Sequence, residues 1–450
     1  MLLCTYVLTT TLQPRSETVK VPHVVVMLVL SLVALVGESA RAQMQGMQMQ
    51  SSVDVNDPMA REGSGTSWLP DSSPMHAWME MFGDDMLMGH GTAFPRYTHV
   101  GGDRDVSAAG RGSNAKIDAP NMFMAMYSHP IGEPAQLGAH AMLSLDPLTE
   151  QGYGYPLLYQ SGESYRGESL HDRQHPHDFF AELSLSYSHR TLSGQSAYVY
   201  VGYPGEPALG PPVFMHRPSG MDDPDAPISH HWQDATHISW GVATLGYSFG
   251  SWKIEGSAFN GREPDEKRYA FDAPRLSSYS TRLSWNPMSD LALQTSFGFV
   301  RSPEALDPQT NVHRTTASAI YDRELGSDSN WATTFVWGQN RENGGDVSNS
   351  YLLETDYQQA ADTFYVRLER VQKSGRELSL TVAPANHLFA VSSYALGYVR
   401  DLLHGTGTDV GIGAQLTLDT NPESIAFIYG GREHLGYQVF LRLRPSRLSM

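Results

Sequence analysis

The sequence of 450 residues is poor in cysteine and in charge: Cys4 is its one cysteine, and 18% of its residues are charged. Cys4 precedes a segment that we expect to be removed, so a disulfide framework and a cysteine-based metal site are excluded. A net charge of −17 also excludes nucleic acid as a partner, because phosphates would repel the chain. Any metal would have to be bound by His, Met, Asp or Glu.

Long hydrophobic runs are scarce as well. The one strongly apolar run, VVVMLVLSLVALVG, covers residues 24–37, whereas a membrane-spanning helix needs roughly 20 residues. Lys20 precedes the run and the small-x-small triplet ARA follows it at 40–42, which is typical of a signal peptide. We therefore expect residues 1–42 to be a signal peptide that is cut after Ala42, and the chain to be exported.

The chain is rich in glycine, tyrosine and uncharged polar residues, arranged in alternating segments. LALQTSFGF at 291–299 and HLGYQVFLRLR at 434–444 place apolar residues on one face and polar residues on the other. Such segments of about ten residues are typical of transmembrane β-barrels, whereas strands of a soluble sandwich usually have five or six. Glu354 and Arg367 lie mid-strand on the polar face, as a water-filled lumen would permit.

We therefore expect an all-β fold, a transmembrane antiparallel β-barrel of about 16 strands, over residues 85–450. Between the expected signal peptide and this barrel lies a methionine-rich stretch, 43–84, that includes QMQGMQMQ and MHAWMEMF. Its low complexity predicts a flexible arm. Because thioethers suit soft Cu(I), the arm is either a disordered tail or a segment that captures copper.

Two long insertions, 146–177 and 204–235, interrupt the alternation and contain many of the histidines. They flank the expected strands 178–190 and 195–203, so a count of crossings places both insertions at the same end of the barrel. Long loops of such barrels are usually external. If the insertions meet, their imidazoles would share one rim.

Imidazole is a ligand that suits copper, zinc and nickel, and a carboxylate can orient it through its second nitrogen. We therefore expect a site for copper or another divalent metal on this rim. The candidate ligands are His171, His175, His177, His216, His230, His231 and His237, and the candidate orienting residues are Asp172 and Asp234. The alternative is a structural network in which hydrogen bonds and ion pairs fold the loops.

Several strings together are similar to an uncharacterised family of bacterial outer-membrane β-barrel proteins. The strings are LSLDPLT (143–149), YPLLYQSGE (155–163), DRQHPHDFF (172–180), PALGPPVFMHRPS (207–219) and HHWQDATHISWGV (230–242). The resemblance covers roughly residues 86–305 and implies a location in the outer membrane, surrounded by its lipid. The family is loosely associated with heavy-metal resistance, especially to copper, which adds a leaning toward copper but no established ligand set.

The sequence leaves more than one function open. The first is an outer-membrane barrel that binds or guides metal ions at the histidine rim, with periplasmic efflux or metal-handling proteins as candidate partners. The alternative is a passive porin or solute channel in which the same loops fold inward as a constriction. An outer-membrane hydrolase is the least favoured, since the sequence contains no G-x-S-x-G or H-E-x-x-H motif. We therefore expect a protein that is not an enzyme.

Overall fold

The structure is a computed structural model that describes residues 49–102, 104, 114–326, 328–345, 347–381, 383–405 and 407–448. The expected signal peptide, residues 1–42, lies outside the described residues, and so do residues 43–48 of the expected arm. No helix among the described residues is long and apolar enough to cross a membrane.

Strands make up more than half of the described residues. The strands of the barrel wall are β2 (Asp85–Ala93), β3 (Arg96–His99), β4 (Ala115–Asp118), β5 (Asn121–Ile131), β6 (Ala135–Leu143), β9 (Phe180–Leu192), β10 (Gln195–Gly202), β11 (Val242–Phe249), β12 (Trp252–Phe259), β13 (Ser278–Met288), β14 (Leu291–Arg301), β15 (Asn311–Gly326), β16 (Ser329–Glu342), β17 (Val347–Gln359), β18 (Asp362–Ser374), β19 (Leu388–Leu403), β20 (Thr408–Thr420) and β21 (Glu433–Pro445). The other elements are β1 (Trp78–Phe82), β7 (Tyr155–Tyr165), β8 (Glu168–Gln174), α2 (Asp146–Thr149), α3 (His230–Gln233), α4 (Glu423–Tyr429), η1 (Met59–Arg61), η3 (Phe214–His216) and η4 (Ala235–His237).

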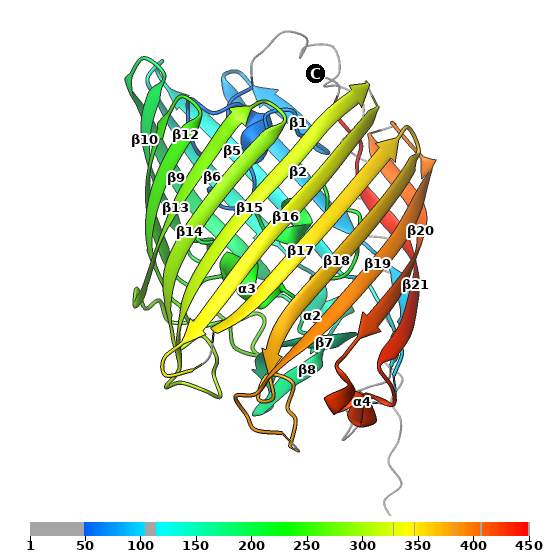
Figure 1. Cartoon of the computed structure of the whole chain (residues 1–450). Helices are drawn as coiled ribbons and strands as arrows, with labels where there is room; N and C mark the ends of the chain where they lie inside the picture. Colours follow the sequence, from blue (N-terminus) through cyan, green and yellow to red (C-terminus); the bar gives the residue numbers. More distant parts are fainter. Residues whose placement is uncertain are drawn as a thin grey trace, which may run out of the picture.

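The wall strands pair antiparallel with their neighbours and close into a barrel (Figure 1). The seam is formed by β21 and β3, which pair from Tyr437 opposite His99 to Phe440 opposite Arg96. β2 and β3 follow one another at one position of the wall, and so do β4 and β5, which gives a closed barrel of 16 strands. The expected all-β fold, an antiparallel barrel of about 16 strands, is confirmed.

The outer face of the barrel is apolar. Successive side chains of a strand point to opposite faces, and the outward positions include Leu185, Leu245 and Leu396, whose exposed fractions are 67%, 67% and 58%. Large apolar side chains exposed all around a closed barrel are stable in hydrocarbon and unfavourable in water. The barrel therefore spans a membrane.

The two ends of the barrel differ. One end has short turns, such as 193–194 between β9 and β10 and 360–361 between β17 and β18. The other end has the long connections, including 144–179 with the β7–β8 hairpin and 203–241 with α3. Figure 1 shows β7, β8 and α4 together at this end, the lower one in that view. Both insertions thus start from the same end, as the count of crossings predicts.

The connection 203–241, which we call the inward loop, folds back into the barrel, where Figure 1 shows α3. None of its residues is exposed. Arg217 donates to Glu354 of β17 and to Asp234, each at 2.6 Å, while Arg367 of β18 lies 3.0 Å from Asp223. The mid-strand charges that we expected to face a water-filled lumen are therefore buried, because they pair with charges of the inward loop.

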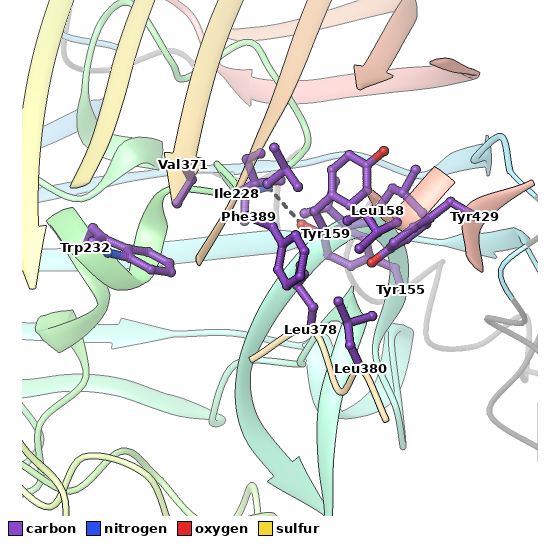
Figure 2. Packing of buried hydrophobic residues seen from close by; sticks show 14 of the residues in the cluster. Tyr155, Leu158, Tyr159, Ile228, Trp232, Val371, Leu378, Leu380, Phe389 and Tyr429 are labelled. Carbon is purple, nitrogen blue, oxygen red and sulfur yellow. Dashed lines mark hydrogen bonds between the residues drawn. The ribbon is translucent and has the colours of Figure 1, made fainter. Parts of the chain in front are cut away.

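Apolar packing also holds the inserted segments against the wall (Figure 2). Trp232 and Ile228 of the inward loop are fully buried in one cluster with Tyr159 of β7, while Val371 and Phe389 come from β18 and β19. Burial of each such side chain contributes roughly 1.5–3 kcal/mol. Most of the two insertions is therefore part of the folded core, while the tip of the β7–β8 hairpin at 166–168 is exposed.

Residues 49–77, which we call the lumen segment, occupy the interior nearer the short turns. The Ser72 amide donates to the Ser289 carbonyl oxygen at 3.1 Å, and the Ser248 hydroxyl donates to Asp54 at 2.7 Å. Both wall residues lie at or next to a short turn. The lumen segment and the inward loop therefore fill the barrel from opposite ends.

This arrangement differs from the flexible arm that we expected over residues 43–84. In the described part of that stretch, Val53 and Trp68 are buried against the wall and residues 78–82 form β1, which pairs with β2. The Trp68 indole donates to Asp57 at 2.7 Å, and the Thr66 hydroxyl donates to Glu255 of β12. The stretch is ordered because it contains enough apolar and hydrogen-bonding side chains to match the polar lumen wall.

The substitution Arg217→Met should release the inward loop. It leaves Asp234 as a buried carboxylate without its arginine and leaves Glu354 with Arg367 as its one remaining arginine partner, and breaking such a buried pair costs about 3–5 kcal/mol. We expect amide hydrogen exchange across the inward loop to accelerate in the purified barrel. As a control, Arg400→Met breaks a half-exposed pair with Asp362, and such a pair contributes little to stability because solvent screens it. If the amides of the inward loop are equally protected from exchange in both variants, Arg217 does not anchor the inward loop.

Candidate functional site

The two insertions touch, and five of the seven candidate histidines come together at their contact. They are His175 and His177 of the first insertion and His230, His231 and His237 of the inward loop. The ring centroids are 5.2 Å apart for His230 and His237, 5.5 Å for His177 and His237, and 6.1 Å for His175 and His231. All five residues are buried, so this histidine cluster lies inside the barrel and not on an open rim.

A glycine of β7 allows the two insertions to approach this closely. Gly162 has a φ of +115°, and a Cβ built on it would lie 2.1 Å from Cε1 of His231. A larger side chain at position 162 would therefore displace the imidazole, and the positive φ itself favours glycine. The backbone of the first insertion thus shapes one wall of the histidine cluster.

Each imidazole of the histidine cluster has its Nδ1 atom beside an oxygen atom that can fix the orientation of the ring. The Nδ1–oxygen distances are 2.7 Å from His177 to Asp146, 2.6 Å from His230 to Asp234, 3.0 Å from His231 to Glu263, 3.1 Å from His237 to the carbonyl oxygen of Asp234, and 3.2 Å from His175 to Glu163. Asp234 therefore contacts two of the rings, His230 through its carboxylate and His237 through its carbonyl oxygen.

Three of these rings have an open Nε2 atom. The Nε2 atoms of His177, His231 and His237 are buried and have no hydrogen-bond partner among the described residues. These three residues border a cavity of about 10 Å³, which is the space of roughly one water molecule. An Nδ1 atom held by an oxygen, together with a free Nε2 atom, is the arrangement of metal-binding imidazoles.

The five imidazoles of the histidine cluster are not arranged as a metal coordination shell in this structure. Across the described ranges, Asp401, His404 and Asp409 are the one group that offers three ligand atoms within 4.8 Å of one another. Asp401 of that group already pairs with Arg442 at 2.7 Å, which neutralises the carboxylate. A metal in the histidine cluster needs Nε2 atoms at about 2.0–2.1 Å, so the imidazoles would have to turn toward one another around it.

The structure places the remaining candidates elsewhere. His216 packs against His90 of β2, with ring centroids 5.2 Å apart. His171 has its Nδ1 3.2 Å from Asp172, and Asp172 also pairs with Arg104 at 3.0 Å. Asp172 therefore orients no ring of the histidine cluster, because its carboxylate is engaged by Arg104, His171 and the Tyr159 amide.

The sequence reasoning missed the contribution of a third connection, between β12 and β13. It supplies Glu263 to the histidine cluster, and its Arg268 donates to Glu163 at 2.6 Å and to Asp178 at 3.2 Å. The available signal was the charged run GREPDEKR at 261–268, which breaks the alternation of the strands on both sides.

Burial keeps several loop imidazoles neutral. It lowers the pKa of His175 and of His237 well below the ordinary value, and nearby cationic or imidazole groups lower both pKa values further. Burial and the neighbouring His90 lower the pKa of His216 to about 3. Since only neutral imidazole binds a metal, these side chains are in the protonation state that ligation requires.

No protein-family model matches the chain, and no curated protein matches it. Among solved structures, the chain is similar to an anion-selective porin from Comamonas acidovorans, with a TM-score of 0.45 and 10% identity over 80% of this chain and 100% of that chain. For OmpF of Salmonella typhi, in complex with daunomycin, the TM-score is 0.48 and the identity 9%, over 81% of this chain and 100% of that chain. For OmpT, an outer membrane protein of Vibrio cholerae, the TM-score is 0.44 and the identity 8%, over 81% of this chain and 99% of that chain. None of these comparisons supports the association with copper resistance.

The half-buried His216 should make folding sensitive to acid. Its folded pKa of about 3 lies below the ordinary 6.5, so the stability that neutral His216 contributes is complete above pH 6.5 and is lost as the pH falls toward 3. Between pH 7.5 and pH 5 the free energy of unfolding should fall by up to about 2 kcal/mol more in the wild type than in the variant His216→Asn.

The measurement is the free energy of unfolding in urea, in detergent micelles, at pH 7.5 and pH 5. The substitution His387→Asn, at a residue that is exposed in the connection between β18 and β19, serves as the matched control and should keep the pH dependence of the wild type. An unchanged pH dependence in His216→Asn would show that His216 is not the group that resists protonation.

Proposed function

We propose that the chain is an outer-membrane channel for small solutes, narrowed by its own inward-folded segments. A barrel of 16 strands can enclose an aqueous channel. Here the observation that carries the proposal is the occupation of the interior from both ends, by the lumen segment and by the inward loop. This is the arrangement expected of a channel whose loops form a constriction held by polar contacts.

The space that remains supports a small solute. A cavity of about 150 Å³ lies beside β2 and β5, and a cavity of this size accommodates roughly a benzene-sized molecule. Short turns usually face the periplasm and long loops the outside. In that orientation the inward loop would meet solutes that arrive from the medium, while the lumen segment would face the periplasm.

Replacing residues 207–235 with a short Gly-Ser linker should widen the passage. We expect the wild type to give small single-channel conductances in planar bilayers and the shortened protein to give values several-fold larger, because the inward loop no longer fills the interior. Arg400→Met, which changes only an outward ion pair, should conduct like the wild type. If the shortened protein folds but neither it nor the wild type conducts, the protein is not a channel.

A second function, binding of copper or another divalent metal, is favoured by the three open Nε2 atoms of the histidine cluster. The ligands would be His177, His231 and His237, with Asp146, Glu263 and the Asp234 carbonyl holding their Nδ1 atoms. Metal-handling proteins of the periplasm would then be the candidate partners.

The double substitution His177→Asn and His237→Asn should weaken binding of Zn(II) or Cu(II) to the purified barrel by about 10–100-fold or more, since loss of even an outer-shell partner costs that much. Isothermal titration would measure the affinity. The matched control is His313→Asn with His387→Asn, two histidines outside the histidine cluster. Absence of saturable binding to the wild type would end this second candidate and leave the channel proposal intact.

A further inference from the structure

One side of the barrel interior is lined by methionine. The residues are Met79 of β1, Met86 and Met88 of β2, and Met122, Met124 and Met126 of β5, all with exposed fractions of 3–6%. They occupy alternate positions, so each strand presents methionine to the interior. Many other inward positions of the wall are polar or charged, as at Arg282, Thr316 and Ser350, which is the usual character of a barrel lumen.

These methionines do not simply fill the space. Eight methionines border the cavity of about 150 Å³, which we call the methionine chamber. Met88, Met122, Met124 and Met126 belong to the wall, and the others come from the lumen segment and the inward loop. A cavity destabilises a protein because its lining atoms lose contacts, and flexible methionine side chains are well suited to close one. An open chamber among so many thioethers therefore suggests a place for a ligand.

Imidazoles complete the lining of the methionine chamber. His90 and His216 stand edge to face on one side. His177 also borders it, and its buried Nε2 has no partner among the described residues. Thioether sulfur and neutral imidazole nitrogen are soft or borderline ligands, whereas Mg²⁺ and Ca²⁺ require oxygen. Three carboxylates also border the methionine chamber, but Glu62 pairs with His140, Asp146 with His177 and Asp223 with Arg367. Thioethers and imidazoles are therefore the donors left for a ligand, and they favour soft cations over hard ones.

We propose that the methionine chamber binds a soft monovalent cation, Cu(I) or Ag(I), through thioethers of β2 and β5 and an imidazole of His90 or His216. The site is distinct from the histidine cluster, because His175, His230, His231 and His237 do not border the methionine chamber. His177 is the one residue common to both linings. The proposal concerns binding and does not depend on whether the barrel conducts.

Silver is the probe of choice, because Ag(I) needs no reductant. Wild-type barrel in detergent should bind Ag(I) saturably, as measured by isothermal titration. The triple variant Met122→Leu, Met124→Leu, Met126→Leu should bind about a hundredfold more weakly, because it loses three sulfur atoms; loss of even one outer-shell partner costs up to that much. Leucine and methionine have similar volumes, so the packing is largely preserved.

The matched control is the triple variant Met79→Leu, Met86→Leu, Met142→Leu. These residues belong to the same buried group but do not border the methionine chamber, so this variant should bind Ag(I) within about threefold of the wild type. Methyl resonances of labelled methionine should shift with Ag(I) at positions 122, 124 and 126, and not at 79, 86 and 142.

The outcomes separate the proposals. Absence of saturable Ag(I) binding to the wild type, equal losses in both triple variants, or full affinity in the chamber variant would each overturn the methionine chamber as a soft-cation site. Loss of Ag(I) binding in the variant His177→Asn, His237→Asn with retention in the chamber variant would place the ion in the histidine cluster and overturn it as well. Failure of Ag(I) binding would leave the conductance comparison between the wild type and the shortened protein unaffected, so that comparison tests the channel separately.

Discussion

The pairing of buried charges inside the barrel is the constraint on which the rest of the structure depends. A closed wall in hydrocarbon satisfies its own backbone, but inward charges such as Glu354, Arg367 and Arg282 still need partners. The inward loop and the lumen segment supply them through Arg217, Asp223 and Thr66. Without those segments the charges would face an open pore; with them, the charges are paired and the interior is largely filled. The inward loop that these pairs hold carries His216, His230, His231 and His237.

The wall of the barrel could be predicted from the sequence because its signal is local. Alternation with a period of two is visible within single segments, such as 291–299, which became β14. The same logic located both insertions at one end, since an even number of crossings separates them. The meeting of His175 and His177 with His230, His231 and His237 was also anticipated, because loops from adjacent hairpins start from neighbouring points of the wall.

What could not be predicted depends on contacts between distant parts of the chain. The lumen segment looked like a disordered tail, because its partners, such as Glu255 and Ser289, lie about 200 residues away. For the same reason Glu263 was overlooked as a partner of His231, and His216 was grouped with the other histidines although it faces His90 on the far wall. The polar face of a strand has the same pattern whether water or a folded loop lies against it.

His177 has a consequence of its own, because one ring serves as a wall between two cavities. Its Nδ1 is fixed by Asp146 at 2.7 Å, so the ring has a single free nitrogen, and a nitrogen lone pair can be donated in one direction at a time. Occupants of the two cavities that both use it must compete, and thermodynamic linkage makes the penalty that each imposes on the other identical. Two species bound in the barrel interior would therefore lower each other's affinity by competing for the one free nitrogen of His177.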